Sequence, residues 1–470
     1  MAVDVEPESA FEAPRELSGK LAGLSLSQQV WALAVWPLLE MLLTFLVGTV
    51  DLMLAGRLNP EPIALAATDA LGVASFLGWL LAMIFQAVGV GATALIARAI
   101  GGRHRRLANA ALGQALLMAV LLGVVVGAIL WLAAPHMAYL AGRSNLANDY
   151  CTTYLRIIAL AAPANAILLI GNAALRGAGD TRTPFGVMLT VNVVNIIASI
   201  AFVYGPAPIG GHGVGGIAAG TALAWWSGAV LTIAALLAGK GGLRLRLFRL
   251  RPHAHTLRRI IRVGMPNLFE SVAGMWIGNF LVLMIVGKLA IDGIIGVHMI
   301  IIRFESLSFL AGAAMGITAS TLAGQYLGLG DPVRARKAVM LCWGYASVIM
   351  SAIGILYLTI PRQLASLITD VEPMIEMSIT PLRICGPIQV FFATQIVLAG
   401  ALRGAGDTRS TMIITSCMTL LVRVPGVYLV GITFGYGFLG IWIVLAVELC
   451  LRAIVFAARF LHGGWTRVEV

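Results

Sequence analysis

Carboxyl and carboxamide side chains interrupt several long apolar stretches in the first half of this sequence. Asp51 lies towards the end of one stretch, and Asn172, Asn195 and Ser199 lie in two later ones. Oxygen atoms of this kind can ligate a cation, and a carboxylate can also take up a proton. If the stretches are neighbouring helices, these side chains predict a cation or proton site. Two alternatives remain open, since Asp51 could be a solvated interfacial acid and asparagines can hydrogen-bond neighbouring helices.

The second half carries a different set of polar side chains in its apolar stretches. The set comprises Glu270 in one stretch and His298, Arg303 and Glu305 in the next. Arg303 could neutralise Glu270 or Glu305, so a structural ion pair and a proton relay are both open interpretations. A single histidine on an apolar helix, such as His298, is more often a core residue with its hydrogen bonds satisfied. Glu448 and Arg452 are one helical turn apart and are expected to form a local pair.

The composition places these residues in a membrane rather than in a soluble core. Hydrophobic residues make up 59% of the chain and charged residues only 11%, with a mean hydropathy of +0.93. A soluble domain has about a quarter charged residues. Lipid offers no partner to unpaired backbone groups, so spanning segments of about 20 apolar residues must be helices. We predict an all-α membrane protein with twelve transmembrane helices, at 29–51, 66–98, 107–133, 150–175, 183–204, 214–238, 264–287, 293–327, 338–360, 379–402, 411–430 and 437–460.

A repeated motif indicates that the chain arose by internal duplication of one structural unit. The nine-residue string Ala-Leu-Arg-Gly-Ala-Gly-Asp-Thr-Arg occurs at 174–182 and again at 401–409, 227 positions later. The same shift places Gly89 on Gly316 and Gly101 on Gly328. Six spans per half return the chain to its starting side, which predicts two parallel-repeat six-helix lobes with a cavity between them. The expected division is a disordered cytoplasmic tail at 1–27, lobes at 28–238 and 263–461, a basic cytoplasmic linker at 239–262 and a cytoplasmic tail at 462–470.

Each copy of the nine-residue motif is predicted to be a structural turn between two spans. Its glycines permit a tight turn that ends one helix, and its aspartate can cap the next helix. Its arginines can bond helix-end carbonyls or the acids of the motif. A catalytic role is disfavoured, because no nucleophile is paired with the motif. The residues given this structural role are Arg176, Gly177, Gly179 and Asp180 in the first copy, and Arg403, Gly404, Gly406 and Asp407 in the second.

The formal net charge of +11 indicates membrane orientation rather than a nucleic-acid partner. Basic residues cluster at 98–106, at 240–262, at 334–337 and in both nine-residue motifs, and all these segments share one side if the chain crosses twelve times. Basic loops face the cytoplasm, which predicts a multi-pass protein of the plasma (inner) membrane with both termini cytoplasmic. Residues 1–27 lack the features of a cleaved signal. The linker 239–262 is expected to contact membrane lipid.

The sequence motifs of several common activities are absent from this chain. No Gly-x-x-x-x-Gly-Lys-Ser/Thr motif is present, and the dinucleotide-like spelling at 211–216 lies in an external loop without a βαβ context. The five cysteines are scattered and form no Cys-x-x-Cys pair or Cys/His cluster, so no metal site or disulfide framework is expected. No nucleophile–base–acid constellation appears within the spans. We therefore expect neither an enzyme nor a cofactor, and any work must draw on an ion gradient or the substrate's own gradient.

Three motifs link the chain to a known family. They are Val50-Asp51 with the following Ala55-Gly56-Arg57, the doubled Leu-Arg-Gly-Ala-Gly-Asp-Thr at 175–181 and 402–408, and the segment Gly324-Gln325-Tyr326-Leu327-Gly328. With these motifs the chain after residue 27 resembles the multidrug and toxic compound extrusion (MATE) family, nearest its DinF-like branch. The resemblance implies two six-helix lobes, a V-shaped cavity, and export of organic cations coupled to inward H⁺ or Na⁺.

The resemblance also implies site residues. The family's first-lobe cation site carries over to Asp51, Asn172 and Asn195. Many members have an aspartate one turn later, where this chain has Ser199, and the loss of that charge favours protons over Na⁺.

In the second lobe the family's pattern is incomplete. Glu270 matches an acid seen in part of the family. The acid that some relatives place in the tenth span is absent: Phe392 lies about there, and Gln395 is the nearby polar group.

The leading hypothesis is a secondary active antiporter that exports amphipathic, cationic organic compounds in exchange for H⁺, with Na⁺ as the alternative ion. We expect a small-molecule substrate, contact with membrane lipid, no nucleic-acid partner and a monomer. A second hypothesis is a flippase of lipid-linked precursors, which Arg303 and Arg423 keep open because both lie inside spans. A membrane-embedded enzyme is disfavoured by the missing catalytic constellation. A non-transporting scaffold or receptor would not explain paired bundles with buried acids.

Overall fold

All regular structure in the part of the chain that the structure describes is helical. This computed structural model describes residues 17, 21–58, 60–140, 145–206, 208–246 and 250–468. Within those ranges, eleven helices are long and apolar enough to cross a membrane, and a pair of helices bent by 60° forms a twelfth span. The predicted all-α membrane fold is confirmed. The span expected at 379–402 is the bent pair, which breaks between Cys385 and Gln389.

The first lobe contains six long helices joined by short connections. They are α1 (Leu26–Gly56), α2 (Glu61–Gly101), α3 (Arg105–Leu140), α4 (Asn145–Gly177), α5 (Arg182–Tyr204) and α6 (Gly213–Leu237), followed by a 3₁₀ turn, η2 (Lys240–Gly242). Prolines lie inside α1, α3 and α4, at Pro37, Pro135 and Pro163. Helices containing proline are common in membranes, because neighbouring helices satisfy the freed backbone groups.

The second lobe repeats this plan with more interruptions. Its elements are α7 (Ala254–Phe269), η4 (Glu270–Ile277), α8 (Gly278–Gly287), α9 (Ile294–Gly328), α10 (Pro332–Thr359), α11 (Pro361–Ser366), α12 (Glu372–Cys385), α13 (Gln389–Gly404), α14 (Thr408–Cys417), η5 (Met418–Arg423), α15 (Val424–Tyr428), η6 (Leu429–Thr433), α16 (Gly437–His462) and η7 (Gly464–Arg467). The segments η4, η5 and η6 are π-helical turns within two continuous spans. Such turns are often found at functional sites.

Two segments that were expected to lie outside the lobes contain ordered structure. The helix α7 begins at Ala254, so the second part of the expected linker 239–262 is helical. In the expected tail 1–27, Leu17 and Leu21 are buried against the core of the second lobe. The rest of that tail up to position 20 lies outside the described residues.

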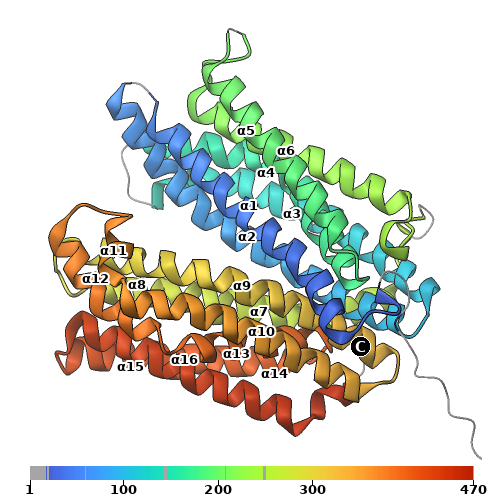
Figure 1. Ribbon diagram of the computed structural model, residues 1–470. Helices are drawn as coiled ribbons and strands as arrows, with labels where there is room; N and C mark the ends of the chain where they lie inside the picture. Colours follow the sequence, from blue (N-terminus) through green and yellow to red (C-terminus); the bar gives the residue numbers. More distant parts are fainter. Residues whose placement is uncertain are drawn as a thin grey trace, which may run out of the picture.

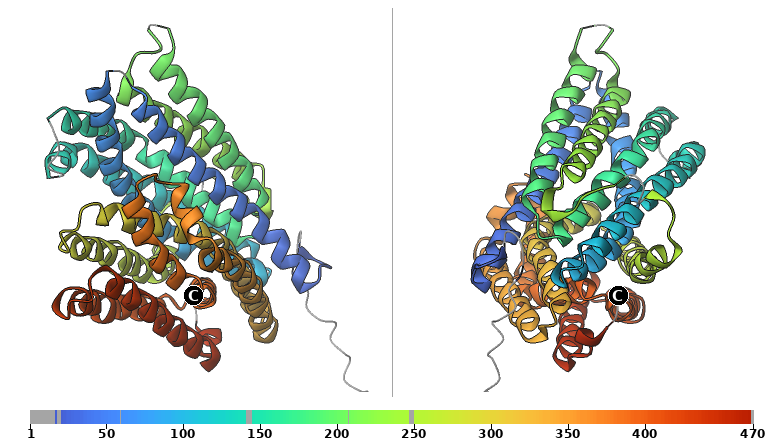
Figure 2. Two further views of the ribbon diagram at one scale, coloured as in Figure 1. Left: turned by 60° about the vertical axis from the view of Figure 1, so that its left-hand side comes forward. Right: turned by 90° about the vertical axis from the view of Figure 1, so that its right-hand side faces the viewer.

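The two lobes converge at one end of the molecule, and their ribbons diverge towards the other (Figure 1). The further views in Figure 2 show the same two bundles. At the converging end, a Cβ atom added to Gly101 of α2 would lie 1.9 Å from the carbonyl oxygen of Gln325 in α9. A Cβ atom added to Gly328 of α9 would lie 2.1 Å from the carbonyl oxygen of Arg98 in α2. The shift of 227 residues exchanges these two contacts, as expected for lobes related by an approximate two-fold axis.

The first helix of each lobe starts against the opposite lobe. In α1, Val30 and Leu33 belong to the apolar core of the second lobe. In α7, Ile260 belongs to the core of the first lobe, and a Cβ added to Gly91 of α2 would lie 2.4 Å from the carbonyl oxygen of Ile260. Leu33 and Ile260 are equivalent under the 227-residue shift. The two lobes are therefore interlocked by reciprocal contacts.

The nine-residue motifs form the turns that follow α4 and α13. Gly179 and Gly406 have φ values of +87° and +90°, which glycine adopts without strain. Asp180 accepts hydrogen bonds from Thr183 N at 3.3 Å and Thr183 Oγ1 at 2.8 Å, at the start of α5. In the second copy, Asp407 accepts a hydrogen bond from Ser410 Oγ at 2.7 Å. Both aspartates therefore hold the first turn of the following helix.

The first glycine of each motif allows the turn to pack closely against a long helix of its own lobe, α2 or α9. A Cβ atom added to Gly177 would lie 3.0 Å from the carbonyl oxygen of Thr93 in α2. One added to Gly404 would lie 2.1 Å from that of Ser320 in α9. These contacts are again related by the 227-residue shift.

We predict that both motifs are accessible from the same side of the membrane. Arg182 and Arg409 are exposed at the starts of α5 and α14, so a single cysteine at either position, with the native cysteines replaced, should react with an impermeant maleimide from the same side. A cysteine in place of the exposed Asp292, between α8 and α9, should react from the opposite side. Labelling of the two motif positions from opposite sides would contradict parallel lobes.

Candidate functional site

Three helices of the first lobe bring a carboxylate, a carboxamide and a hydroxyl together. Asp51 lies five residues before the end of α1, Asn195 lies in α5, and Thr221 lies in α6. The hydroxyl of Thr221 shares its proton between Asp51 Oδ2, at 3.3 Å, and Ile217 O of its own helix, at 3.2 Å, and it accepts from Asn195 Nδ2 at 3.0 Å. Thr221 therefore links the acid to the carboxamide, and the structure places two of the predicted site residues in one cluster.

The cluster contains buried oxygen atoms without hydrogen-bond partners. Among the described residues, Asp51 Oδ1, Asn195 Oδ1 and Ser199 Oγ are buried and accept or donate no hydrogen bond. Ser199 lies beside this cluster. A Cβ atom added to Gly220, the residue before Thr221, would lie 2.3 Å from Ser199 Oγ. Buried polar groups are normally satisfied, so unpaired oxygens of this kind are candidates for holding a proton or a cation.

Asn172 does not join this cluster. Its Oδ1 accepts a hydrogen bond from Thr232 Oγ1 at 3.5 Å, and Thr232 lies eleven residues after Thr221 on α6. Eleven residues correspond to about 16 Å along a helix. The reason is the antiparallel course of the helices: Asn172 lies near the end of α4, whereas Asn195 lies in the middle of α5. The predicted grouping of Asn172 with Asp51 and Asn195 therefore needs correction.

Both motif arginines pair with acids in the first span of their own lobe. Arg176 Nη1 donates to the two carboxylate oxygens of Glu40 in α1, at 2.9 and 3.2 Å. Arg403 Nη2 donates to Glu270 Oε1 at 2.6 Å. Glu40 and Glu270 follow the prolines Pro37 and Pro266 by three and four residues. The arginines thus bond acids inside the spans, rather than the helix-end carbonyls or motif acids that the sequence suggested.

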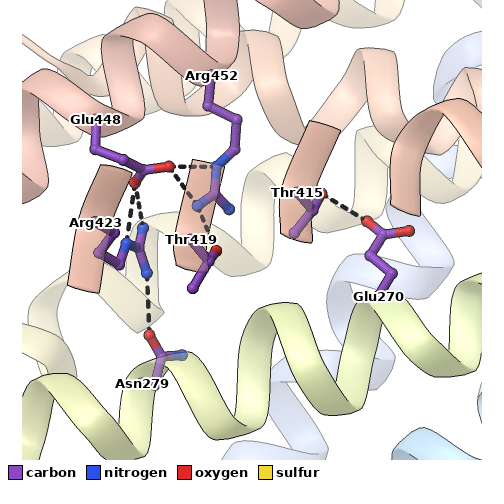
Figure 3. A network of polar contacts seen from close by, with 7 residues as sticks. All are labelled: Glu270, Asn279, Thr415, Thr419, Arg423, Glu448 and Arg452. Carbon is purple, nitrogen blue, oxygen red and sulfur yellow. Dashed lines mark hydrogen bonds and ion pairs between the residues drawn. The ribbon is translucent and has the colours of Figure 1, made fainter. Parts of the chain in front are cut away.

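Glu270 is fully engaged by its neighbours. The residue is 1% exposed, and besides Arg403 it accepts hydrogen bonds from Thr411 Oγ1 at 2.7 Å and Thr415 Oγ1 at 3.0 Å. Figure 3 shows Thr415 reaching Glu270 from the adjacent span. One cation and two hydroxyl donors therefore satisfy this buried carboxylate.

A second buried acid in this lobe is shared by two arginines. Arg423 donates from Nε to Glu448 Oε2 at 3.0 Å and from Nη1 to Asn279 Oδ1 at 3.1 Å (Figure 3). Arg452 donates from Nε to Glu448 Oε1 at 2.7 Å and from Nη2 to Thr419 Oγ1 at 2.8 Å. The predicted pair of Glu448 and Arg452 is present, and Arg423 adds a partner that one-turn spacing could not indicate.

The other second-lobe candidates are dispersed. His298 is buried between Trp442 and Phe438, with ring centroids 5.2 and 6.3 Å away, and its Nδ1 has no hydrogen-bond partner among the described residues. Gln395 Oε1 is also buried and unpaired within those residues. Arg303 is exposed, and the ion pair of Glu270 is made with Arg403 instead. Glu305 accepts a hydrogen bond from the thiol of Cys385 at 3.4 Å.

Sequence reasoning missed two kinds of functional neighbour. Thr221 lies in an apolar helix with no flanking motif, so nothing in its own segment marked it as the link between Asp51 and Asn195. The partners of Arg176 and Arg403 lie 136 and 133 positions away. In the described ranges, no group of three or more His, Cys, Asp or Glu side chains could hold a metal ion.

A helical membrane protein with two parallel lobes and buried polar clusters in both has the architecture of a transporter. Comparison with known families agrees: the MatE profile matches residues 37–201 and 267–429, more than half of the chain. The chain belongs to the MatE family, whose members are transporters and not enzymes.

Similar proteins cover nearly the whole chain. It is 29% identical over 436 residues to "Probable multidrug resistance protein NorM" of Thermotoga maritima, covering 92% of this chain and 91% of that protein. It is 28% identical to "Multidrug resistance protein PmpM" of Pseudomonas aeruginosa, with 93% and 92% coverage. A solved structure described as the outward-facing conformation of a multidrug resistance MATE family transporter matches with a TM-score of 0.87 at 21% identity, covering 95% of this chain and 98% of that one. This last likeness shows the fold.

We predict that Arg403→Met lowers stability more than it lowers transport per folded molecule. The change leaves the carboxylate of Glu270 buried without its cation, which typically costs about 3 kcal/mol or more. Removing both charges, in Glu270→Gln/Arg403→Met, should recover part of that loss. Thermal unfolding in detergent measures both effects.

The matched control is Arg362→Met. Arg362 pairs with Glu372 and Glu376 at an exposed position, where ion pairs contribute little to stability, so its loss should lower the melting temperature far less than Arg403→Met does. Normal membrane yield and melting of Arg403→Met together with abolished flux would show that the arginine acts in transport rather than in the scaffold.

Proposed function

We propose that this protein is a secondary active antiporter that exports amphipathic, cationic organic compounds in exchange for protons. The observation that carries the proposal is the contrast between Asp51 and three other acids within the spans. Glu40, Glu270 and Glu448 each bond an arginine. Asp51 bonds the hydroxyl of Thr221, and its other oxygen has no partner among the described residues. A carboxylate without a fixed cation can exchange a proton for a cationic substrate, which is the requirement of such an antiporter.

Protons are favoured over Na⁺ as the coupling ion by the charge of the site. Asp51 is the acid of the cluster, and Asn195, Ser199 and Thr221 contribute neutral oxygens. A single proton can therefore remove the whole charge of the cluster. A Na⁺ site would be expected to have more oxygen ligands and more charge than this cluster offers.

The export of drug-like compounds is supported by the two relatives named above, both described as multidrug resistance proteins. The alternative of a lipid-linked precursor flippase is weakened by Arg423, because Glu448 and Asn279 already engage its guanidinium group. Placement in the DinF-like branch remains part of the proposal and rests on the resemblance of the motifs. The basic ends of the spans support an inner-membrane location with both termini cytoplasmic, and we propose a monomer.

We predict that Asp51→Asn abolishes proton-coupled export while leaving the protein in the membrane. The substitution keeps the size of the side chain and removes the charge that protonation would otherwise remove. In proteoliposomes loaded with a cationic dye, export by the unmodified protein should follow an imposed pH gradient and ignore a Na⁺ gradient. Asp292→Asn, at an exposed loop, is the matched control and should transport normally. Na⁺-driven export by Asp51→Asn would refute both the site and the ion, and a null Glu270→Gln with an active Asp51→Asn would assign coupling to the second lobe.

We predict that Thr221→Val lowers coupled export by about tenfold. Valine keeps the shape of threonine but cannot bond Asp51 and Asn195, so the geometry of the cluster is lost. Thr232→Val is the matched control, since Thr232 lies on the same helix and bonds Asn172 instead. Initial rates of dye export, normalised to protein, measure the difference. Equal losses in the two variants would mean that Asn172 belongs to the coupling site after all.

A further inference from the structure

A groove lies at the end of the molecule where α1 and α10 begin and α16 ends. Its volume is about 1060 Å³, and it is lined by the first residue of α1, the first turns of α10 and the segment 462–467. The helix α16 stops at His462 because Gly463 adopts φ +77°, and the chain then folds back through η7. We call this feature the terminal groove.

The terminal groove is lined by uncompensated positive charge. Four cationic or titratable side chains line it: Arg336, Lys337, His462 and Arg467. Among the residues that the structure describes, none that lines the groove is an aspartate or a glutamate. The acid that precedes α10, Asp331, accepts from the backbone N–H of Arg334 at 2.8 Å and lies 3.5 Å from the guanidinium group of that residue. The groove therefore presents cations whose charges are not balanced by its own walls.

The remaining walls of the terminal groove are apolar. Val333 and Met340 of α10 are 63% and 39% exposed, and Leu26 and Leu341 lie beside them. The floor is Trp465, which is fully buried and stacks on Phe460 with ring centroids 5.1 Å apart. Arg336 lies over the same Phe460 ring at 5.9 Å. One site thus combines cations with an apolar path that continues along a spanning helix.

We propose that the terminal groove binds an anionic phospholipid. The headgroup phosphate lies against Arg336 and Lys337, and an acyl chain follows Met340 and Leu341 towards the membrane interior. Three spans begin or end at the groove, so it lies at the boundary between lipid and water, where basic pockets between helices recognise acidic headgroups. This role is additional to transport and does not rest on the proposed coupling site.

A lipid in this position would join elements of both lobes. The start of α1 packs into the second lobe at Val30 and Leu33, and Leu26 lies one turn before Val30 in the wall of the groove. The bound molecule would therefore contact α1, α10 and α16 together. Its retention should stabilise the contact of α1 with the second lobe.

Native mass spectrometry of the full chain in detergent tests the proposal, with phosphatidylglycerol and phosphatidylcholine of identical acyl chains as probes. The unmodified protein should retain phosphatidylglycerol preferentially. The double variant Arg336→Gln/Lys337→Gln should bind it about 25-fold more weakly, or about fivefold for each charge removed. Arg105→Gln/Arg258→Gln, which removes two exposed cations outside the groove, is the charge-matched control and should retain the preference. An unchanged preference in the groove variant, or an equal loss in the control, would overturn the proposal.

Two further arms distinguish other occupants. Inorganic phosphate that displaces phosphatidylglycerol at equal concentration would show a simple anion site and would overturn the lipid assignment. Residues 1–16 contain Asp4, Glu6, Glu8, Glu12 and Glu16, so a variant lacking them is also measured. Unchanged lipid binding in that variant supports the proposal. Lipid binding that appears only after the deletion would identify the acidic segment as the occupant instead.

Discussion

The close approach of the α2 and α9 backbones sets the geometry on which both lobes depend. At Gly101 and Gly328, a side chain of any size would collide with the facing carbonyl group, so these helices pack through bare backbone. In lipid, small residues drive helix association because van der Waals packing replaces the hydrophobic effect. The first nine-residue motif extends the contact. Gln325 of α9 donates to the carbonyl oxygen of Gly177 at 3.1 Å, and Thr321 donates to that of Arg176 at 3.1 Å. One end of the molecule is thus a continuous junction between the lobes.

From this junction, each lobe uses the same arrangement to hold its first helix. The helix leaves the opposite lobe, passes a proline and meets the motif arginine of its own lobe through Glu40 or Glu270. The lobes then differ in how they treat their remaining acids. The second lobe neutralises Glu448 with two arginines, whereas Asp51 of the first lobe has a threonine and an unpaired oxygen. The two copies of the scaffold therefore treat their acids differently: Glu40, Glu270 and Glu448 bond arginines, whereas Asp51 bonds the hydroxyl of Thr221.

The sequence was sufficient to predict the features that depend on the composition of single segments and on their repetition. Spans, their helical state and the parallel repeat could be predicted from apolar run length and from the 227-residue shift. It also placed Asp51 and Asn195 in one site, with help from the resemblance. It failed for Asn172, whose depth depends on where α4 and α5 start and end. It also failed for the arginines, because Arg403 and Glu270 come together only after the lobe has folded.

The amino-acid sequence by itself determined that this protein is a helical, two-lobed membrane protein. Lipid leaves unpaired backbone groups no partner, so apolar runs of this length have one stable form. Only the tertiary structure decided which polar side chains meet. Helix rotation, depth and the π-helical turns determine whether two groups in different spans face each other, and small shifts in any of them change the partners. Thr221 bonds Asp51 while Thr232, on the same helix, bonds Asn172, because the two threonines lie at different depths.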